Sequence, residues 1–162
     1  MTNFGALLTA LSRAEVEFIV VGGVAAAAHG IARSTSDLDI VYNRTPENIR
    51  RLVDVIRPME PYLRGAPPGL PFHWNEKTIE QGLNFTLITN LGELDILGEI
   101  TGGGGYPRLL PHAEIFDLFN VKCPCLNLEK LIEVKNAAGR PKDFEPMAEL
   151  KALLQERAAK KY

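Results

Sequence analysis

Hydrophobic and polar residues follow a pattern over the first thirty positions that predicts a helix, a strand and a second helix. Residues 3–14 repeat apolar side chains at the spacing of a helix with one buried face. These side chains are Phe4, Leu7, Leu8 and Leu11. The run Phe18–Val21 is continuously apolar, which predicts a strand covered on both faces. Gly22 and Gly23 end this run, and the alanine-rich residues 24–29 predict a short helix.

The middle of the chain predicts strands and a helix around one irregular segment. Residues 45–59 predict a helix in which Thr45 caps the amino end and Pro46 takes the first helical position. Residues 60–71 hold too many prolines and glycines for a regular element, so we expect a loop that could cover a site. The strands of this region are expected at residues 36–43, 83–90 and 92–100.

The C-terminal third predicts two helices after a mixed region of short elements at residues 113–127. Asn127 is placed to cap a helix over residues 128–138, and Gly139 is placed to stop it. Asp143 is placed to cap a last helix that runs to about residue 157. The order of elements predicts an α/β or α+β fold with a helical C-terminal part. The length favours one domain over residues 1–162, with the helices of residues 127–158 packed on it.

Composition and charge narrow the class of protein. The chain has 162 residues, 46% hydrophobic and 23% charged, with a formal net charge of −2, so no global basic field predicts nucleic-acid binding. No apolar run is long enough to span a membrane, and the amino end lacks the features of a signal peptide. We therefore expect a cytoplasmic protein. Cys123 and Cys125 are expected to be reduced structural thiols.

The glycine pair Gly22–Gly23 lies where a strand leads directly into a helix. Glycine lets the backbone come close to a ligand, and a helix start offers unpaired N–H groups to phosphate. A tight turn that needs positive φ is the alternative interpretation. The chain contains neither the P-loop pattern nor the dinucleotide-binding glycine spacing. The pair therefore indicates a phosphate site only in combination with other residues.

Two acids, Asp37 and Asp39, interrupt an otherwise apolar strand. Because they are two positions apart, they project from one face of the strand, opposite to the face of Leu38. A solvent-facing strand with alternating acids is the plain explanation. The segment "GELDIL" repeats the pattern with Glu93 and Asp95 on one face. If the two strands are neighbours, the acids converge beside the glycine pair and form an oxygen-ligand site for Mg²⁺.

These residues resemble the signature of the polymerase-β-like nucleotidyltransferases. The resemblance consists of "VGG", thirteen residues and "DLDI", followed by a third acid, Asp95, on a later strand. The "R-x-T-x-D-L-D" form at Arg33 to Asp39 and the "VKNAAGRPKDF" run are most similar to the AbiEii-type nucleotidyltransferases, which are associated with toxin–antitoxin systems. The resemblance covers about residues 18 to 150.

The resemblance implies a nucleotidyltransferase fold, with a mixed β-sheet flanked by helices. It implies two Mg²⁺ ions held by three acids and a nucleoside triphosphate (NTP) as substrate. The chemistry would be transfer of a nucleoside monophosphate to a hydroxyl of an RNA such as tRNA, of a protein or of a small molecule, with pyrophosphate leaving. The residues implied in this chain are Asp37, Asp39 and Asp95 as metal ligands and catalytic residues, and Gly22, Gly23, Arg33, Thr35 and Lys135 as nucleotide contacts.

Several alternatives remain open at the level of sequence. Lys135 fits a solvated helix face as well as a phosphate contact, and Arg33 fits a surface salt bridge as well as a site residue. Gly102–Gly105 fits a flexible loop or a lid. The whole chain also fits a non-catalytic nucleotide-binding or antitoxin-like partner of a toxin, or an antibiotic-type small-molecule nucleotidyltransferase.

Overall fold

The computed structural model describes residues 1–31, 34–139 and 144–160. The predicted helix cap Asp143 lies outside these residues. In chain order the elements are α1 (Phe4–Arg13), β1 (Phe18–Val21), α2 (Gly22–Ala28), β2 (Asp37–Tyr42), α3 (Pro46–Ile56), β3 (Tyr62–Leu63), α4 (Glu76–Gln81), β4 (Asn84–Thr89), β5 (Gly92–Leu97), β6 (Glu99–Ile100), β7 (Gly104–Gly105), α5 (Tyr106–Leu109), β8 (Ala113–Leu118), β9 (Val121–Leu126), α6 (Leu128–Ala138) and α7 (Phe144–Lys160).

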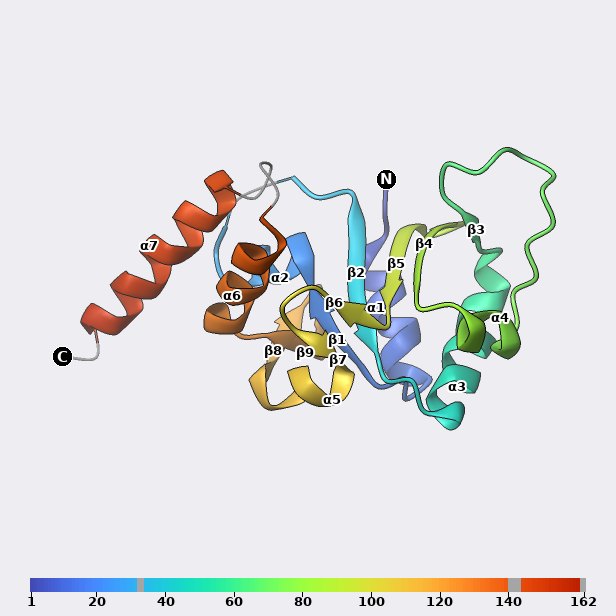
Figure 1. Cartoon of the computed structure of the whole chain (residues 1–162), viewed down its shortest axis with the longest axis horizontal. Helices are drawn as coiled ribbons and strands as arrows, with labels where there is room; N and C mark the ends of the chain where they lie inside the picture. Colours follow the sequence, from blue (N-terminus) through green and yellow to red (C-terminus); the bar gives the residue numbers. More distant parts are fainter. Residues whose placement is uncertain (32–33, 140–143, 161–162) are drawn as a thin grey trace.

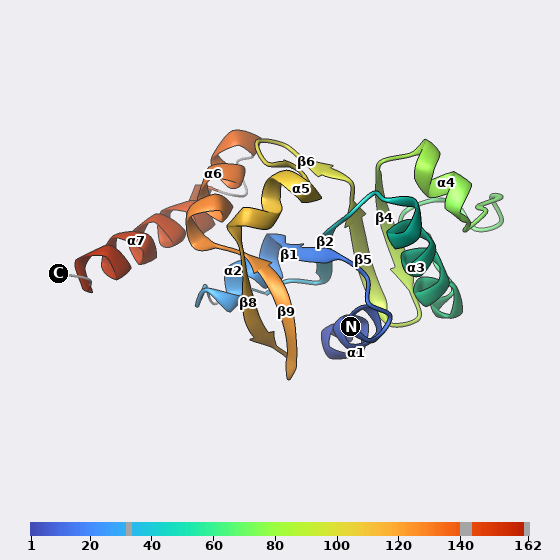
Figure 2. The same ribbon diagram turned by 90° about the horizontal axis from the view of Figure 1, so that it is seen from below.

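Seven strands form one sheet in the order β3-β4-β5-β2-β1-β9-β8, and β6 and β7 form a separate short ribbon. The sheet is mixed, because β2 pairs with β5 in parallel and β1 pairs with β9 in parallel, while the other neighbours are antiparallel. Helices α6 and α7 lie at one end of the fold, and α3 and α4 lie at the other (Figures 1 and 2). The predicted combination of a mixed sheet, flanking helices and a helical C-terminal part is confirmed.

The buried faces of the strands explain why these segments pair. All four residues of β1 are buried, as its continuous apolar run predicts. In the first four residues of β2 and from Glu93 onward in β5, partly exposed positions alternate with buried ones, so this part of each strand turns one apolar face toward the core. Leu38, Ile40, Leu94 and Ile96 are fully buried on that face. The acids between them therefore lie on the opposite face of the sheet.

The predicted capping residues that lie within the described part of the chain, Thr45, Asn127 and Gly139, take their predicted places. Thr45 accepts a hydrogen bond from the backbone N–H of Asn48, and Pro46 opens α3. Asn127 accepts one from the N–H of Lys130 at 2.8 Å, and Gly139 ends α6 with φ +62°. Among the described residues, no helix is both long enough and apolar enough to cross a membrane.

Four local features differ from the sequence predictions. Helix α2 begins at Gly22 and not at Val24, because the positive φ of Gly22 (+68°) turns the chain from β1 directly into the helix. Helix α4 was not predicted from its sequence. The mixed region at residues 113–127 is a regular β8–β9 hairpin, and the segment Gly102–Gly105 contains β7, which pairs with β6.

Candidate active site

The acids of two distant segments meet because β2 and β5 are parallel neighbours. Their register places Asp39 beside Asp95, and Asp37 beside Glu93. One carboxylate oxygen from each of Asp37, Asp39 and Asp95 lies within 4.8 Å of the others. The predicted convergence of these three acids is therefore observed. We call these three residues the acid cluster.

The environment of the cluster makes Asp39 the most perturbed carboxyl group. Burial, which is the largest cause, acts together with the hydrogen-bonding and charge effects of Asp37 and Asp95 to raise the pKa of Asp39 to about 9. Among the described residues, Asp39 Oδ1 is buried without a hydrogen-bond partner. A buried polar atom without a partner is costly, and a cation would supply the missing interaction.

The other two acids differ in their balance of effects. Burial raises the pKa of Asp95, although the charge of Arg64 opposes this rise. Burial also tends to raise the pKa of Asp37, but hydrogen bonds with Asp39 and Asp95 and the charge of Arg64 hold it below its usual value. The cluster is therefore a set of coupled carboxyl groups that favours fewer than three negative charges without a cation.

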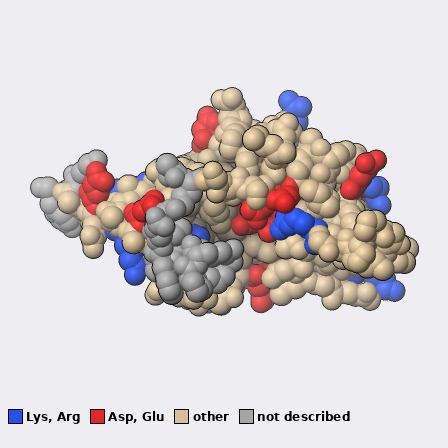
Figure 3. All heavy atoms as spheres, turned by 90° about the horizontal axis from the view of Figure 1, so that it is seen from above, with Lys and Arg blue, Asp and Glu red and all other residues tan. Residues whose placement is uncertain are grey.

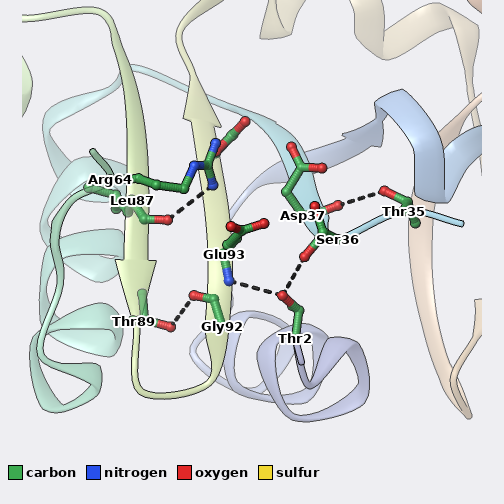
Figure 4. A network of polar contacts seen from close by, with 10 residues as sticks. Thr2, Thr35, Ser36, Asp37, Arg64, Leu87, Thr89, Gly92 and Glu93 are labelled. Atoms are coloured by element: carbon green, nitrogen blue, oxygen red, sulfur yellow. Dashed lines mark hydrogen bonds and ion pairs between the residues drawn. The ribbon is translucent and has the colours of Figure 1, made fainter.

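Arg64 contacts the cluster from residues 60–71, which were predicted to form a loop without regular elements but contain the short strand β3, because Tyr62 and Leu63 pair with β4. Its Nη2 donates a hydrogen bond to Asp95 Oδ1 at 2.7 Å, and its Nη1 donates one to the carbonyl oxygen of Leu87 at 3.4 Å. Figure 4 shows the Arg64 side chain extending across the sheet toward Asp37. The loop therefore supplies one charged residue to the site.

The glycine pair lies directly against the acids and the segment before them. A Cβ atom on Gly22 would overlap the carboxylate of Asp39. A Cβ atom on Gly23 would lie 2.8 Å from Thr35 Oγ1. Thr35 Oγ1 in turn donates a hydrogen bond to the carbonyl oxygen of Asp37 at 3.3 Å. Both glycines are therefore required for the close approach of α2 to β2, whatever they do for a ligand.

The amino end of the chain fastens β5 to the segment that leads into β2 (Figure 4). Thr2 Oγ1 donates a hydrogen bond to the carbonyl oxygen of Ser36 and accepts one from the backbone N–H of Glu93 at 3.0 Å. Thr2 thus bridges the beginnings of the two strands that carry the cluster. We infer that it helps to fix their relative register.

A cleft of about 390 Å³ opens beside the cluster. Gly22, Asp39 and Asp95 line it, and so does Lys135 of α6. The remaining lining residues are mostly apolar: Val21, Leu97, Ile100, Leu126, Leu131, Val134 and Ala138, together with Asn84, Glu99 and Thr101. Figure 3 shows acidic and basic side chains next to one another near the centre of one face of the molecule. The lining of the cleft thus combines acidic residues, one lysine and a majority of apolar residues.

The structure brings most of the predicted site residues together. The acid cluster, Gly22 and Gly23 lie around one strand end, with Thr35 immediately before it. Lys135 lines the same cleft as Gly22, Asp39 and Asp95. Arg33 lies outside the described residues. Arg64 was missed, because a lone arginine in an irregular segment carries no periodic signal.

Comparison with known proteins adds information on the fold. No protein-family model matches the chain, and no curated protein matches it significantly. Among solved structures, TM1012 of Thermotoga maritima, named as a candidate nucleotidyltransferase, is similar at a TM-score of 0.58 and 19% identity, covering 93% of this chain and 89% of that one.

Two antibiotic-modifying enzymes have similar structures. The lincosamide adenylyltransferase LnuA, bound to lincomycin, matches at a TM-score of 0.61 and 16% identity, covering 91% of this chain and 94% of that one. ANT(2")-Ia, in complex with adenylyl-2"-tobramycin, matches at 0.54 and 13% identity, covering 96% and 95%. The sequence identities are low, so these likenesses speak for architecture. The chain has the fold of these nucleotidyltransferases.

Proposed function

We propose that the protein is a Mg²⁺-dependent nucleotidyltransferase that moves a nucleoside monophosphate from an NTP to an acceptor hydroxyl, with release of pyrophosphate. The observation that carries this proposal is the acid cluster, in which one carboxylate oxygen from each acid lies within 4.8 Å of the others, and whose members Asp39 and Asp95 line a cleft together with Gly22 and Lys135. The nucleotidyltransferase fold of the similar structures supports it.

The donor set of the cluster fits Mg²⁺. Three carboxylates offer the hard oxygen ligands that this ion prefers, and the buried Oδ1 of Asp39 has an unmet need for a positive partner. Asp37, Asp39 and Asp95 would hold the metal, which we expect to be two ions. When bound, the metal would neutralise phosphate charge and help to activate the attacking hydroxyl.

Other residues around the cluster would bind the nucleotide and the acceptor. Lys135 would contact the triphosphate, because this residue lines the same cleft as Asp39 and Asp95. Gly22 would let the phosphates approach the backbone at the start of α2. Asp95 would lie nearest to the acceptor hydroxyl. We keep Thr35 and Arg33 as further nucleotide contacts proposed from the family resemblance.

The candidate acceptors of the proposed reaction are RNA (tRNA), a protein and a small molecule. A small-molecule acceptor is favoured by one specific observation, since LnuA is a lincosamide adenylyltransferase and ANT(2")-Ia carries an adenylylated tobramycin. An AbiEii-type role with a toxin or antitoxin partner rests only on the sequence motif at Arg33 to Asp39. A non-catalytic nucleotide-binding partner protein would keep the fold without the transfer reaction.

The test is a transfer assay with each of the four NTPs labelled at the α-phosphate. The purified full chain is incubated with Mg²⁺ and with tRNA, candidate proteins, a lincosamide or an aminoglycoside. We expect Mg²⁺-dependent label transfer to one acceptor class, lost in Asp39→Asn and kept in the control Asp54→Asn, which removes an exposed acid on α3. Absence of transfer to every acceptor, with no Mg²⁺-dependent NTP binding by calorimetry, would reject the proposal.

A further inference from the structure

Arg64 belongs to none of the motifs that indicate the proposed function, yet it is bonded to the acid cluster. We propose that Arg64 neutralises the charge of Asp95 when no metal ion is bound, and that it competes with the metal ion for this carboxylate. The proposal rests on the metal-dependent function proposed above. It adds that Arg64 gives Asp95 a positive partner before the metal binds.

The geometry shows a charged contact that is more than a surface ion pair. The Nη2–Oδ1 distance is 2.7 Å, and the side chains of Arg64 and Asp95 are only 28% and 13% exposed. The backbone also fixes the approach, because the N–H of Arg64 donates to the carbonyl oxygen of Thr86 at 3.0 Å and Thr86 pairs with Asp95 in the β4–β5 register. Partly buried, charge-assisted bonds of this kind are stronger than exposed ones.

The charges explain why the contact forms and why it must compete with a metal ion. The cluster gathers three carboxylates within 4.8 Å, and the Arg64 guanidinium binds one of them. A metal ion held by the same carboxylates would bring a second positive charge close to the guanidinium. Two cations at one carboxylate repel each other, so each weakens the binding of the other by the same factor.

The loop that carries Arg64 is folded on itself, so it can respond as a unit. The Tyr62 hydroxyl donates hydrogen bonds to the carbonyl oxygens of Pro67 and Leu70. These bonds close residues 62–70 into one unit, which begins with β3 and continues as a loop that projects beyond the sheet (Figure 1). Arg64 connects this unit to the acid cluster. Metal binding should therefore loosen the 62–70 unit by weakening the bond at Asp95.

The first experiment is a calorimetric titration of the full chain with Mg²⁺ alone. Arg64→Gln removes the charge, and Arg50→Gln is the matched control, because Arg50 is an exposed arginine on α3. We expect Arg64→Gln to bind Mg²⁺ at least about fivefold more tightly than the unchanged protein, at the low end of typical coupling factors. Arg50→Gln should bind as the unchanged protein does.

The second experiment is hydrogen exchange of the unchanged protein, which tests the proposal even if the variant does not fold. Saturation with Mg²⁺ should speed exchange at the Arg64 amide and through residues 62–70. Equal or weaker Mg²⁺ binding by folded Arg64→Gln, or exchange in residues 62–70 that Mg²⁺ leaves unchanged, would overturn the inference while the proposed function stands. Lack of Mg²⁺ binding by both proteins would remove the metal site of the proposed function, and this inference with it.

Discussion

Replacement of Asp39 by asparagine should stabilise the metal-free protein and remove its response to Mg²⁺. Burial and the neighbouring acids raise the pKa of Asp39 from 3.8 to about 9. The unfolded chain loses this proton as the pH passes 3.8, whereas the folded protein keeps it until about pH 9. The contribution of Asp39 to stability is therefore complete below pH 3.8 and is lost as the pH rises toward 9. Asparagine has no such proton to lose.

The size of the effect follows from the pKa difference. One pKa unit corresponds to about 1.4 kcal/mol, and pH 7 lies about three units above the unfolded pKa of 3.8. At pH 7 the unchanged protein has therefore lost at most about 4 kcal/mol of stability that Asp39→Asn keeps. The free energy of unfolding of Asp39→Asn should exceed that of the unchanged protein by an amount that grows by up to about 1.4 kcal/mol per pH unit. This growth should extend from about pH 5 to about pH 8.

The assay is urea unfolding in the presence of a chelator, repeated across that pH interval and then with Mg²⁺. The exposed Asp54 supplies the control variant, Asp54→Asn, whose difference from the unchanged protein should not vary with pH. Mg²⁺ should raise the stability of the unchanged protein and of the control, but not of Asp39→Asn. A pH-independent difference, or a less stable Asp39→Asn at every pH, would refute the reasoning.

Three further predictions concern the cleft and the core. In urea unfolding, Gly22→Ala should lose about 1–2 kcal/mol of stability because of the positive φ of this position alone, and Gly23→Ala should lose less. Gly22→Ala should also bind Mg²⁺ more weakly, because its Cβ would displace the Asp39 carboxylate. Lys135→Ala should weaken NTP binding about tenfold in calorimetry, whereas Lys151→Ala on α7 should leave it unchanged. Burial is the main cause that raises the pKa of Cys123 to about 11 and the pKa of Cys125 to about 12. A thiol reagent at pH 8 should therefore label these thiols only after unfolding, and rapid labelling of the native protein would contradict this.

The sequence predicted those parts of the site that depend on local periodicity. The alternation of apolar and acidic residues in β2 and β5 placed the acids on one face, because a side chain two positions along a strand returns to the same face. Whether β2 and β5 were neighbours could only be stated as a condition. The pairing of strands far apart in the chain depends on the whole fold, which the family resemblance implied and the register of Asp39 beside Asp95 shows.

The missed elements are those without a repeating pattern. Helix α4 has six residues and buries one of them, Ile79, which is too little for a helical period to be visible. Arg64 reaches Asp95 only because the two residues of β3 add to the edge of β4. The start of α2 at Gly22 depends on a single backbone angle, and residue type alone permits this angle without requiring it.

The parallel pairing of β2 with β5 also has a consequence for the order of folding. Strands β1 and β2 are close in sequence, and β4 and β5 form a hairpin, so each pair can assemble through short-range contacts. The β2–β5 contact closes a long loop and joins the two units. That same step brings Asp39 and Asp95 together, so closing this loop also has to overcome the repulsion between their carboxylates. The acids that the candidate active site needs should therefore slow the joining of these two units during refolding.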